Sequence, residues 1–421
     1  MQTSTSKRSR LWRWLGWTAL SGFLALGLFA LAWPSLLRAL GGAWQPLIPA
    51  WHAGLSIRAQ ELLDQAYSGI DLTRRIDGHV HIAGIGTGGS GCRVNPNLRS
   101  PAHPVEFVRF QLYLSAAGVK NLERADEEFV ARLDELAATT PRGVRLALLA
   151  FDAHYTEDGA IDHAATEFYV PNEYIWELAE RNPERYLPVI SVHPYRADAR
   201  AEVARWGRAG VRMLKWLPNA MGIDPASPRC DDFYDEMAAW DMLLLTHTGE
   251  ERAIEAAEDQ ELGNPLRLRR PLNRGVRVIA AHCASLGSNI DLDNPARGQV
   301  SSFDLFMRLM AEQRYEGRLF GELSGLTLMT RVGPALEQLL DAGHLHGRLV
   351  DGSDYPLPAL NAAISLGQLV SGGFISPADR EALAEIYRAH PLAFDLALKR
   401  CLRSPASGAR FSPQAFEFLE L

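Results

Sequence analysis

Residues 75–81, Arg-Ile-Asp-Gly-His-Val-His, form the most informative stretch of this sequence. They read as a short strand that ends in two histidines separated by one residue. Side chains at positions i and i+2 of a strand lie on the same face, so His79 and His81 present two imidazoles to one point while Val80 packs outward. Neutral imidazoles at this spacing can hold one divalent metal ion.

Seven more short apolar runs follow this strand and alternate with helical patterns. The runs are residues 144–151, 186–193, 211–217, 242–247, 276–282, 318–323 and 349–352. Helical patterns lie at 129–138, 173–181, 199–209, 232–240, 303–313 and 334–341, and closing helices at 361–371, 377–389 and 391–402. Eight strands, each followed by a helix or a long loop, predict an α/β fold of the (β/α)8 TIM-barrel type. An open doubly wound sheet is the alternative, but residues 84–91 after the first strand lack the GxGxxG order of a phosphate loop.

Polar side chains collect where these strands end. The fourth run carries Lys215, the fifth ends at His247, the sixth ends at His282, and the eighth leads into Asp351-Gly352-Ser353-Asp354. Barrel enzymes build their active sites at the carboxyl ends of the strands, so we expect these groups to surround one site.

Three further residues are candidates for the substrate pocket. His154 follows the second strand, His193 ends the third, and Glu322 lies on the seventh. Each has a structural alternative, because a histidine in a loop is often simply hydrogen-bonded and a buried glutamate often pairs with a cation.

The first segment has the pattern of a membrane anchor. Residues 14–37 carry no charge and are rich in Leu, Ala and Phe, which is long enough for a helix to cross a bilayer. A cleaved signal peptide is the alternative, although only residues 39–41 resemble a cleavage site. Four basic residues precede the span and one follows it, which predicts a cytoplasmic tail at 1–13 and a single-pass inner-membrane protein with its body on the periplasmic or extracellular side. We expect a linker and lead-in helix at 38–73, the barrel at 74–402 and a C-terminal extension at 403–421.

Composition excludes several other classes of protein. The chain has 421 residues and a net charge of −7, and its N-terminal segment is basic, so the body is strongly acidic and nucleic acid is a poor partner. The four cysteines form no CxxC pair, which rules out a zinc ribbon or a disulfide-dense scaffold. Pairing of Cys92 with Cys230, both in loops expected on the active face, stays open, as does assembly into a homo-oligomer.

The order HxH, Lys, His, His and Asp on strands one, four, five, six and eight resembles the amidohydrolase superfamily. Segments 77–81, 246–250, 281–285 and 351–356 are most similar to its amidohydrolase-related branch, which includes decarboxylases of the aminocarboxymuconate-semialdehyde type. The resemblance covers roughly residues 74–400, and the N-terminal anchor is additional to the usual pattern.

The resemblance implies a role for each of these residues. His79, His81, His247 and Asp354 would bind a divalent metal, expected to be zinc, and His282 would orient or polarise the substrate. Asp354 would take a proton from the attacking water and return it to the leaving group. A neutral Lys215 could also add carbon dioxide to give a carbamate that bridges two ions, with His247 and His282 on the second. The residues leave open whether Lys215 turns away or pairs with Glu322 instead.

The leading functional hypothesis is a membrane-anchored metal-dependent hydrolase of a small amide, ester or lactone. A metal-dependent decarboxylase of a small unsaturated or aromatic acid is the second hypothesis, on the same site. The third is an inactive, membrane-tethered binding barrel, which the complete set of polar residues at the strand ends disfavours.

Overall fold

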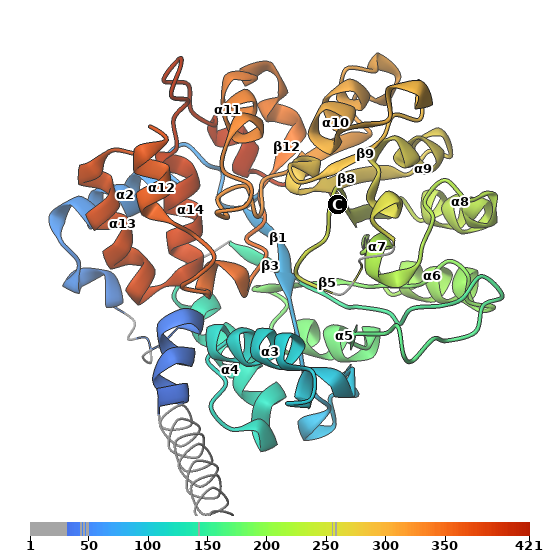
Figure 1. Ribbon diagram of the computed structural model, residues 1–421, viewed down its shortest axis with the longest axis horizontal. Coiled ribbons are helices and arrows are strands. Elements are labelled where there is room, and N and C mark those ends of the chain that lie inside the picture. The colour runs from blue at the N-terminus through green and yellow to red at the C-terminus, as the bar shows by residue number, and fades with distance from the viewer. Residues whose placement is uncertain are drawn as a thin grey trace, which may run out of the picture.

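The computed structural model describes residues 32–42, 44, 47, 50–141, 144–254, 256 and 259–421. Its core is a ring of eight parallel strands with helices outside it (Figure 1). The strands are β1 (Ile76–His81), β3 (Arg145–Leu149), β5 (Tyr186–Val189), β6 (Met213–Trp216), β7 (Leu243–His247), β8 (Arg277–Ala281), β11 (Leu319–Glu322) and β12 (Leu349–Val350). All eight coincide with predicted runs.

Two contacts close the strands into a barrel. Hydrogen-bonded ladders join β1-β3-β5 and β6-β7-β8-β11-β12. A parallel bridge between Ile190 and Leu214 links β5 to β6, and another between Val80 and Tyr355 links β1 to the end of β12. The order of strands around the ring is therefore their order along the chain, which confirms the predicted (β/α)8 barrel.

The helices cover the outside of this ring. Those predicted from the sequence are α2 (Ile57–Tyr67), α4 (Ala125–Ala138), α5 (Asn172–Arg181), α6 (Ala199–Arg208), α8 (Asp231–Ala239), α10 (Ser302–Met310), α11 (Pro334–Asp341), α12 (Leu366–Ser371), α13 (Pro377–Ala389) and α14 (Pro391–Cys401). The helix expected from residue 361 begins only at Leu366, because the 3-10 turn η12 (Leu357–Ala359) and the turns after it precede it. The structure adds α3 (Pro104–Ala116), which the sequence analysis did not predict, and two short helices, α7 (Pro218–Met221) and α9 (Arg269–Asn273).

Short antiparallel strand pairs lie in the loops outside the barrel. The pair β2 (Arg93–Val94) and β4 (Phe168–Tyr169) joins the loops after β1 and β3. The pair β9 (Ser288–Ile290) and β10 (Gln299–Ser301) follows β8. The four cysteines are buried and free, so the structure contains no disulfide between Cys92 and Cys230.

The inside of the barrel is filled by inward-facing strand residues and by the end of the chain. Ile76, Val189, Met213 and Ile279 pack there with Phe418. The backbone N–H of Phe418 donates to the carbonyl of Arg74 at 2.8 Å. The Phe418 ring fills the space that a Cβ on residue 78 would occupy. The predicted C-terminal extension thus closes the barrel opposite the carboxyl ends of the strands, and Figure 1 shows the C-terminus within the ring.

Residues 32–41, the first that the structure describes, form a helical stretch. Within the described ranges no helix has the length and apolar character needed to cross a membrane. The predicted span at 14–37 lies mostly outside those ranges. The lead-in helix α2 is present as predicted, with Ser56 as its N-cap.

Candidate metal centre

His79, His81 and Asp354 form a tight group at the carboxyl end of the barrel. The Nε2 atoms of the two histidines are 3.2 Å apart, and Asp354 Oδ1 lies 3.4 Å from the first and 3.1 Å from the second. The Asp354 backbone is in the left-handed region, with φ of 60°, and its N–H donates to the carbonyl of His79 at 2.8 Å. This turn directs the carboxylate toward the two imidazoles, as the sequence predicted, and the three side chains present ligand atoms to one point.

His247, at the end of β7, lies beside this group. Its Nδ1 is 3.2 Å from a carboxylate oxygen of Glu251, four residues later in the loop after β7. Its Nε2 is buried and has no hydrogen-bond partner among the described residues. A metal-ligating histidine commonly donates its other ring N–H to a carboxylate, which fixes the tautomer that leaves Nε2 free to bind.

His282 follows β8 in an unusual backbone turn. His282, Cys283 and Ala284 have φ of 58°, 49° and 49°, three consecutive left-handed residues that each cost about 1–3 kcal/mol. The turn stacks the His282 ring on His79, with ring centroids 5.3 Å apart, and places it 5.0 Å from the His247 ring. Its Nδ1 contacts the hydroxyl of Ser324 at 2.8 Å, so the other side of the ring is available to the site.

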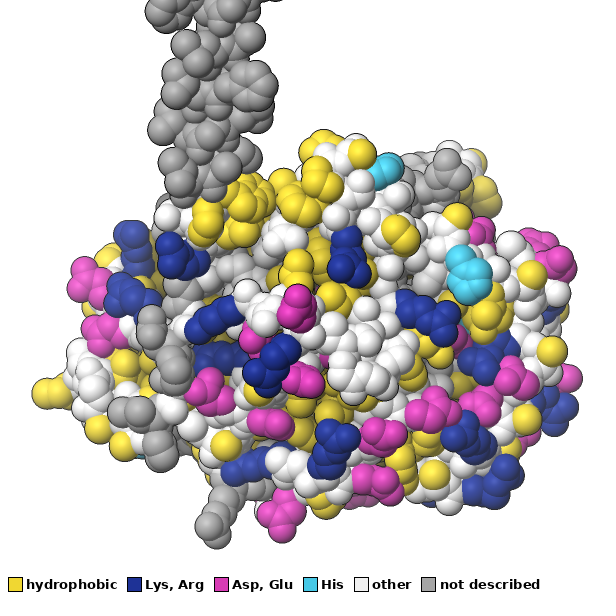
Figure 2. All heavy atoms as spheres, turned by 90° about the horizontal axis from the view of Figure 1, so that it is seen from below, with side chains coloured by type: hydrophobic (Ala, Val, Ile, Leu, Met, Phe, Trp, Pro, Cys, Tyr) yellow, Lys and Arg dark blue, Asp and Glu magenta, His cyan; other side chains and the backbone are white. Residues whose placement is uncertain are grey.

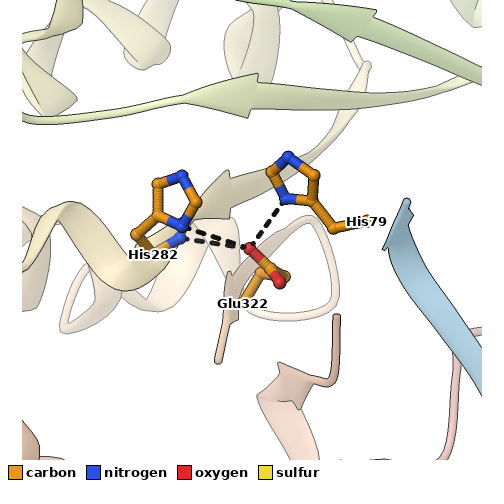
Figure 3. A group of neighbouring side chains, drawn as sticks. All are labelled: His79, His282 and Glu322. Atoms are coloured by element: carbon orange, nitrogen blue, oxygen red, sulfur yellow. Dashed lines mark hydrogen bonds and ion pairs between the residues drawn. The ribbon is translucent and has the colours of Figure 1, made fainter. Parts of the chain in front are cut away.

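Glu322 lies behind the histidines rather than in the substrate pocket predicted for it. Its Oε2 is 3.3 Å from His79 Nδ1 and accepts a hydrogen bond from the His282 N–H at 3.2 Å (Figure 3). It also accepts a hydrogen bond from the Ser324 hydroxyl at 2.6 Å. Burial raises its pKa to about 7, although the Ser324 hydrogen bond acts against this. Through these hydrogen bonds Glu322 orients His79 and His282. Its carboxylate and the two imidazoles also form a second group of ligand atoms that lie within 4.8 Å of one another.

The side chain of Lys215 points into the site. The residue pattern of its strand did not predict this direction. Its Nζ lies 3.0 Å from His79 Nε2, and the residue is buried. Burial lowers the Lys215 pKa to about 8, with nearby Asp354 and Glu322 opposing the shift.

The donor set fits a divalent ion. Burial lowers the pKa of His247 to about 3 and lowers the pKa values of His79 and His282 well below their ordinary range, so their rings are neutral at pH 7. Neutral imidazoles with unprotonated Nε2 atoms around a carboxylate oxygen are the usual ligands of catalytic zinc and related ions.

A cavity of about 120 Å³ opens on these residues. His79, His81, Lys215, His247, His282 and Asp354 form its polar end. Most of the remaining wall is apolar. The residues predicted to meet at the carboxyl ends of the strands therefore do share one pocket.

Comparison with known proteins gives a likeness of fold. No family model and no curated protein matches the chain. Solved structures that it resembles include an uncharacterised TIM-barrel protein from Bordetella bronchiseptica, at 15% identity and a TM-score of 0.43, covering 76% of this chain and 99% of that one. Another is a provisional 2-pyrone-4,6-dicarboxylic acid hydrolase from Pseudomonas putida, at 17% identity and a TM-score of 0.42, covering 82% and 98%. A third is a 5-carboxyvanillate decarboxylase from Novosphingobium aromaticivorans with bound manganese, at 11% identity and a TM-score of 0.43, covering 82% and 94%. The likeness itself concerns the fold.

His193 and His154 lie outside the cavity, contrary to their predicted place in the substrate pocket. His193 Nε2 is 2.8 Å from the carbonyl of Met221, and its Nδ1 accepts from the Tyr195 N–H at 3.2 Å, so both ring nitrogens are engaged. His154 packs against the backbone of Gly222. Neither histidine is among the residues that line the cavity, and both contact the loop after β6, at Met221 and Gly222.

Buried histidines away from the centre predict an acid-sensitive fold. Burial lowers the pKa of His193 and of His390 to about 3, against roughly 6.5 in an unfolded chain. Below pH 6.5 the unfolded chain binds protons that the native state does not, so stability falls as the pH drops. Between pH 7 and pH 5.5 these two groups are expected to lower the free energy of unfolding by about 2.5 kcal/mol. Urea unfolding at both pH values measures this. His390→Gln should remove about half of that loss and exposed His52→Gln none, whereas a pH-independent stability would contradict the assignment.

Two residues in or beside the site, Glu251 and Arg331, were not predicted from the sequence. Glu251 holds His247, and its spacing of four residues after that histidine was the available signal. Arg331 is 8% exposed, donates to the Ser285 hydroxyl at 3.2 Å and forms no ion pair with any carboxylate of the described residues. It comes from the loop after β11, next to the Gly325 backbone and His282.

Proposed function

We propose that this chain is a metal-dependent hydrolase that directs water to the carbonyl of an amide, ester or lactone. The observation that carries the proposal is the convergence of His79, His81 and Asp354 on one point of a cavity. The unpartnered Nε2 of His247 in the same cavity adds a fourth available ligand. When bound, a divalent ion would supply a water of lowered pKa and would polarise the substrate carbonyl.

The chain's own residues would handle the protons and the orientation of the substrate. Asp354 would accept the proton of the attacking water and pass it to the leaving group, since its carboxylate lies at the polar end of the cavity. His282 would hold the carbonyl in place, because Ser324 fixes its Nδ1 and leaves the opposite nitrogen on the cavity side. Glu322 and Glu251 would keep His79 and His247 in the tautomers that bind an ion.

Metal content tests the proposal directly. Protein purified after growth with zinc or manganese, and measured by plasma mass spectrometry, is expected to hold about one equivalent per chain. The double variant His79→Ala/His81→Ala should lose it, while His163→Ala/His344→Ala, two exposed or partly exposed histidines away from the cavity, should retain it. Binding of metal that is unchanged in the first variant would refute the centre.

We propose one ion rather than two. His79, His81 and Asp354 together form a compact ligand set, and Glu322 near His79 and His282 is already occupied by hydrogen bonds. Two equivalents that fall to one or none in Lys215→Ala would support instead the carbamate-bridged pair. One equivalent that survives this change supports the single ion.

Decarboxylation of a small acid is the second candidate, and Arg331 favours it. Its guanidinium is buried beside His282 and forms no ion pair with a carboxylate of the described residues, so it would add positive charge next to the cavity, although it is not part of the cavity lining. A screen of esters, lactones and aromatic acids separates the two reactions. Release of carbon dioxide from an acid indicates decarboxylation, while two hydrolysis fragments indicate the leading proposal.

We further propose that residues 14–37 anchor the protein in the inner membrane with the barrel outside the cytoplasm. The support is the uncharged sequence of this segment and its basic flank. Full-length protein is then expected in the membrane fraction, resistant to high salt. Recovery of a soluble protein that begins near residue 39 would identify a cleaved signal instead.

A further inference from the structure

The cavity is apolar beyond its metal end. Its wall is built of aromatic and aliphatic side chains that come from α3, from α4 and from segments that follow the barrel strands. These include Ile82, Phe110, Tyr113, Phe129, Phe151 and Leu357. Besides the proposed ligands and His282, the charged residues among those lining the cavity are Lys215, beside His79 at the metal end, and Glu251, which contacts His247. A substrate that fills this space must therefore carry an apolar chain or ring next to its reacting group.

Helix α3 forms one wall of the cavity and also contacts the N-terminal helical stretch. Phe110, Tyr113 and Leu114 of α3 line the cavity. At the end of α3, the Ser115 hydroxyl donates to the carbonyls of Leu37 at 3.3 Å and Gly42 at 2.9 Å. The cavity therefore lies next to residues 32–42, the part of the chain in which the uncharged N-terminal sequence 14–37 ends.

The loop after β12 also connects the cavity to the N-terminal helical stretch. Leu357 lines the cavity, and in the same loop the Ala362 N–H donates to the carbonyl of Leu40 at 3.1 Å. The next residue, Ala363, accepts a hydrogen bond from the N–H of Met329 at 3.0 Å. Residues 32–41, α3 and the loops at 329 and 357–363 are thus contiguous around the cavity.

This region exposes apolar side chains that the fold does not cover. Val105 on α3 is 73% exposed, and Leu36, Leu40 and Met329 are each exposed by about two fifths, at 41%, 38% and 44%. Figure 2 shows hydrophobic side chains gathered along one edge of the molecule. Arg38 is exposed between the two leucines, where a basic side chain suits lipid phosphate groups. We call Leu36, Leu40, Val105 and Met329 the apolar rim.

We propose that the apolar rim rests on a lipid bilayer and that the cavity beside it receives an apolar acyl or aryl substrate dissolved in that bilayer. The occupant is a membrane because the uncharged residues 14–37 lead straight into the rim, which keeps the barrel at the lipid surface. An apolar substrate would pass from lipid to cavity without crossing water. The part of this inference that concerns the substrate rests on the proposed metal centre, whereas the part that concerns the rim does not.

Contact with lipid is tested by site-specific fluorescence. Single cysteines at Val105→Cys, Met329→Cys and Leu421→Cys are labelled with bimane in full-length protein, whose four native cysteines are buried. Leu421 is exposed at the opposite, amino end of the barrel strands. In phosphatidylcholine vesicles that carry nitroxide-labelled acyl chains, labels at 105 and 329 are expected to lose more than about half of their fluorescence and the label at 421 less than about a tenth. Equal quenching at all three positions, or none at 105, would overturn the proposal.

Alkyl hydroxamates of increasing length test the cavity, because the hydroxamate chelates the ion and the chain must then occupy the apolar wall. Calorimetry with zinc-loaded protein is expected to show that hexanohydroxamate binds about a hundredfold more tightly than acetohydroxamate. Phe110→Asn should reduce this ratio at least about tenfold, and Phe110→Leu should preserve most of it. If acetohydroxamate itself does not bind, the metal centre is refuted. If it binds but chain length has no effect, the metal centre stands and the apolar substrate is refuted.

Discussion

Replacing Asp354 with asparagine is expected to lower kcat at least about a hundredfold on the substrate identified by the screen, the low end for loss of a general acid or base. Asparagine keeps the size of the side chain and one oxygen that can approach the histidines, but it cannot accept the proton of the attacking water. The variant should therefore keep its fold and retain more metal than His79→Ala/His81→Ala.

Three measurements make this result interpretable. Circular dichroism verifies the fold, metal analysis verifies the centre, and initial rates give kcat. Asp304→Asn, at an exposed site on α10, is the matched control and should leave all three unchanged. Near-normal turnover in Asp354→Asn would eliminate the proposed role, whatever its metal content.

The strands of the barrel could be predicted because each is a short apolar run that ends in a polar residue. Their parallel order then follows from the helices between them. The sequence did not predict helix α3, because its apolar residues are distributed all around the helix. They include Phe107, Val108, Leu112 and Leu114. One side of α3 lines the cavity and another contacts residues 32–42, so the helix lacks the single apolar stripe that identifies an amphipathic helix.

The residues of the candidate metal centre could also be predicted, but the contacts that orient them could not. The i, i+2 spacing of His79 and His81 on a strand predicts that their side chains lie on one face. By contrast, Glu322 contacts His79 from a position 243 residues away in sequence, and only the closed barrel brings the two together. The direction of Lys215 was undetermined because Met213 and Leu214 are both apolar, and both prove to be fully buried, one inside the barrel and one under the helices. Arg331 could not be predicted, because nothing in the sequence around it shows that it is buried without an ion pair to a carboxylate of the described residues.

A buried charge network holds the strand ends that carry the metal centre. Asp351, just before the Asp354 turn, accepts from Arg75 at 2.6 Å and from Lys399 of α14 at 2.8 Å. Lys399 also donates to Asp395 at 2.6 Å and to the carbonyl of Gly352 at 2.7 Å. All of these charged groups are nearly inaccessible to solvent. Lys399 thus links the segment 351–354 to α14, a helix outside the barrel, while Arg75 holds Asp351 from β1's side.

Replacing Lys399 with methionine is expected to lower the free energy of unfolding by about 3–5 kcal/mol, the usual cost of removing one member of a buried ion pair. The loss arises because Asp395 and Asp351 would keep buried charge with less compensation. Urea unfolding measures it, and the exposed Lys120→Met should change stability by less than about 0.5 kcal/mol. The double variant Lys399→Met/Asp395→Asn removes the uncompensated carboxylate as well, so it should recover part of the loss. A loss below about 1 kcal/mol in Lys399→Met would mean that Arg75 alone holds Asp351 and that α14 does not determine the position of the Asp354 turn.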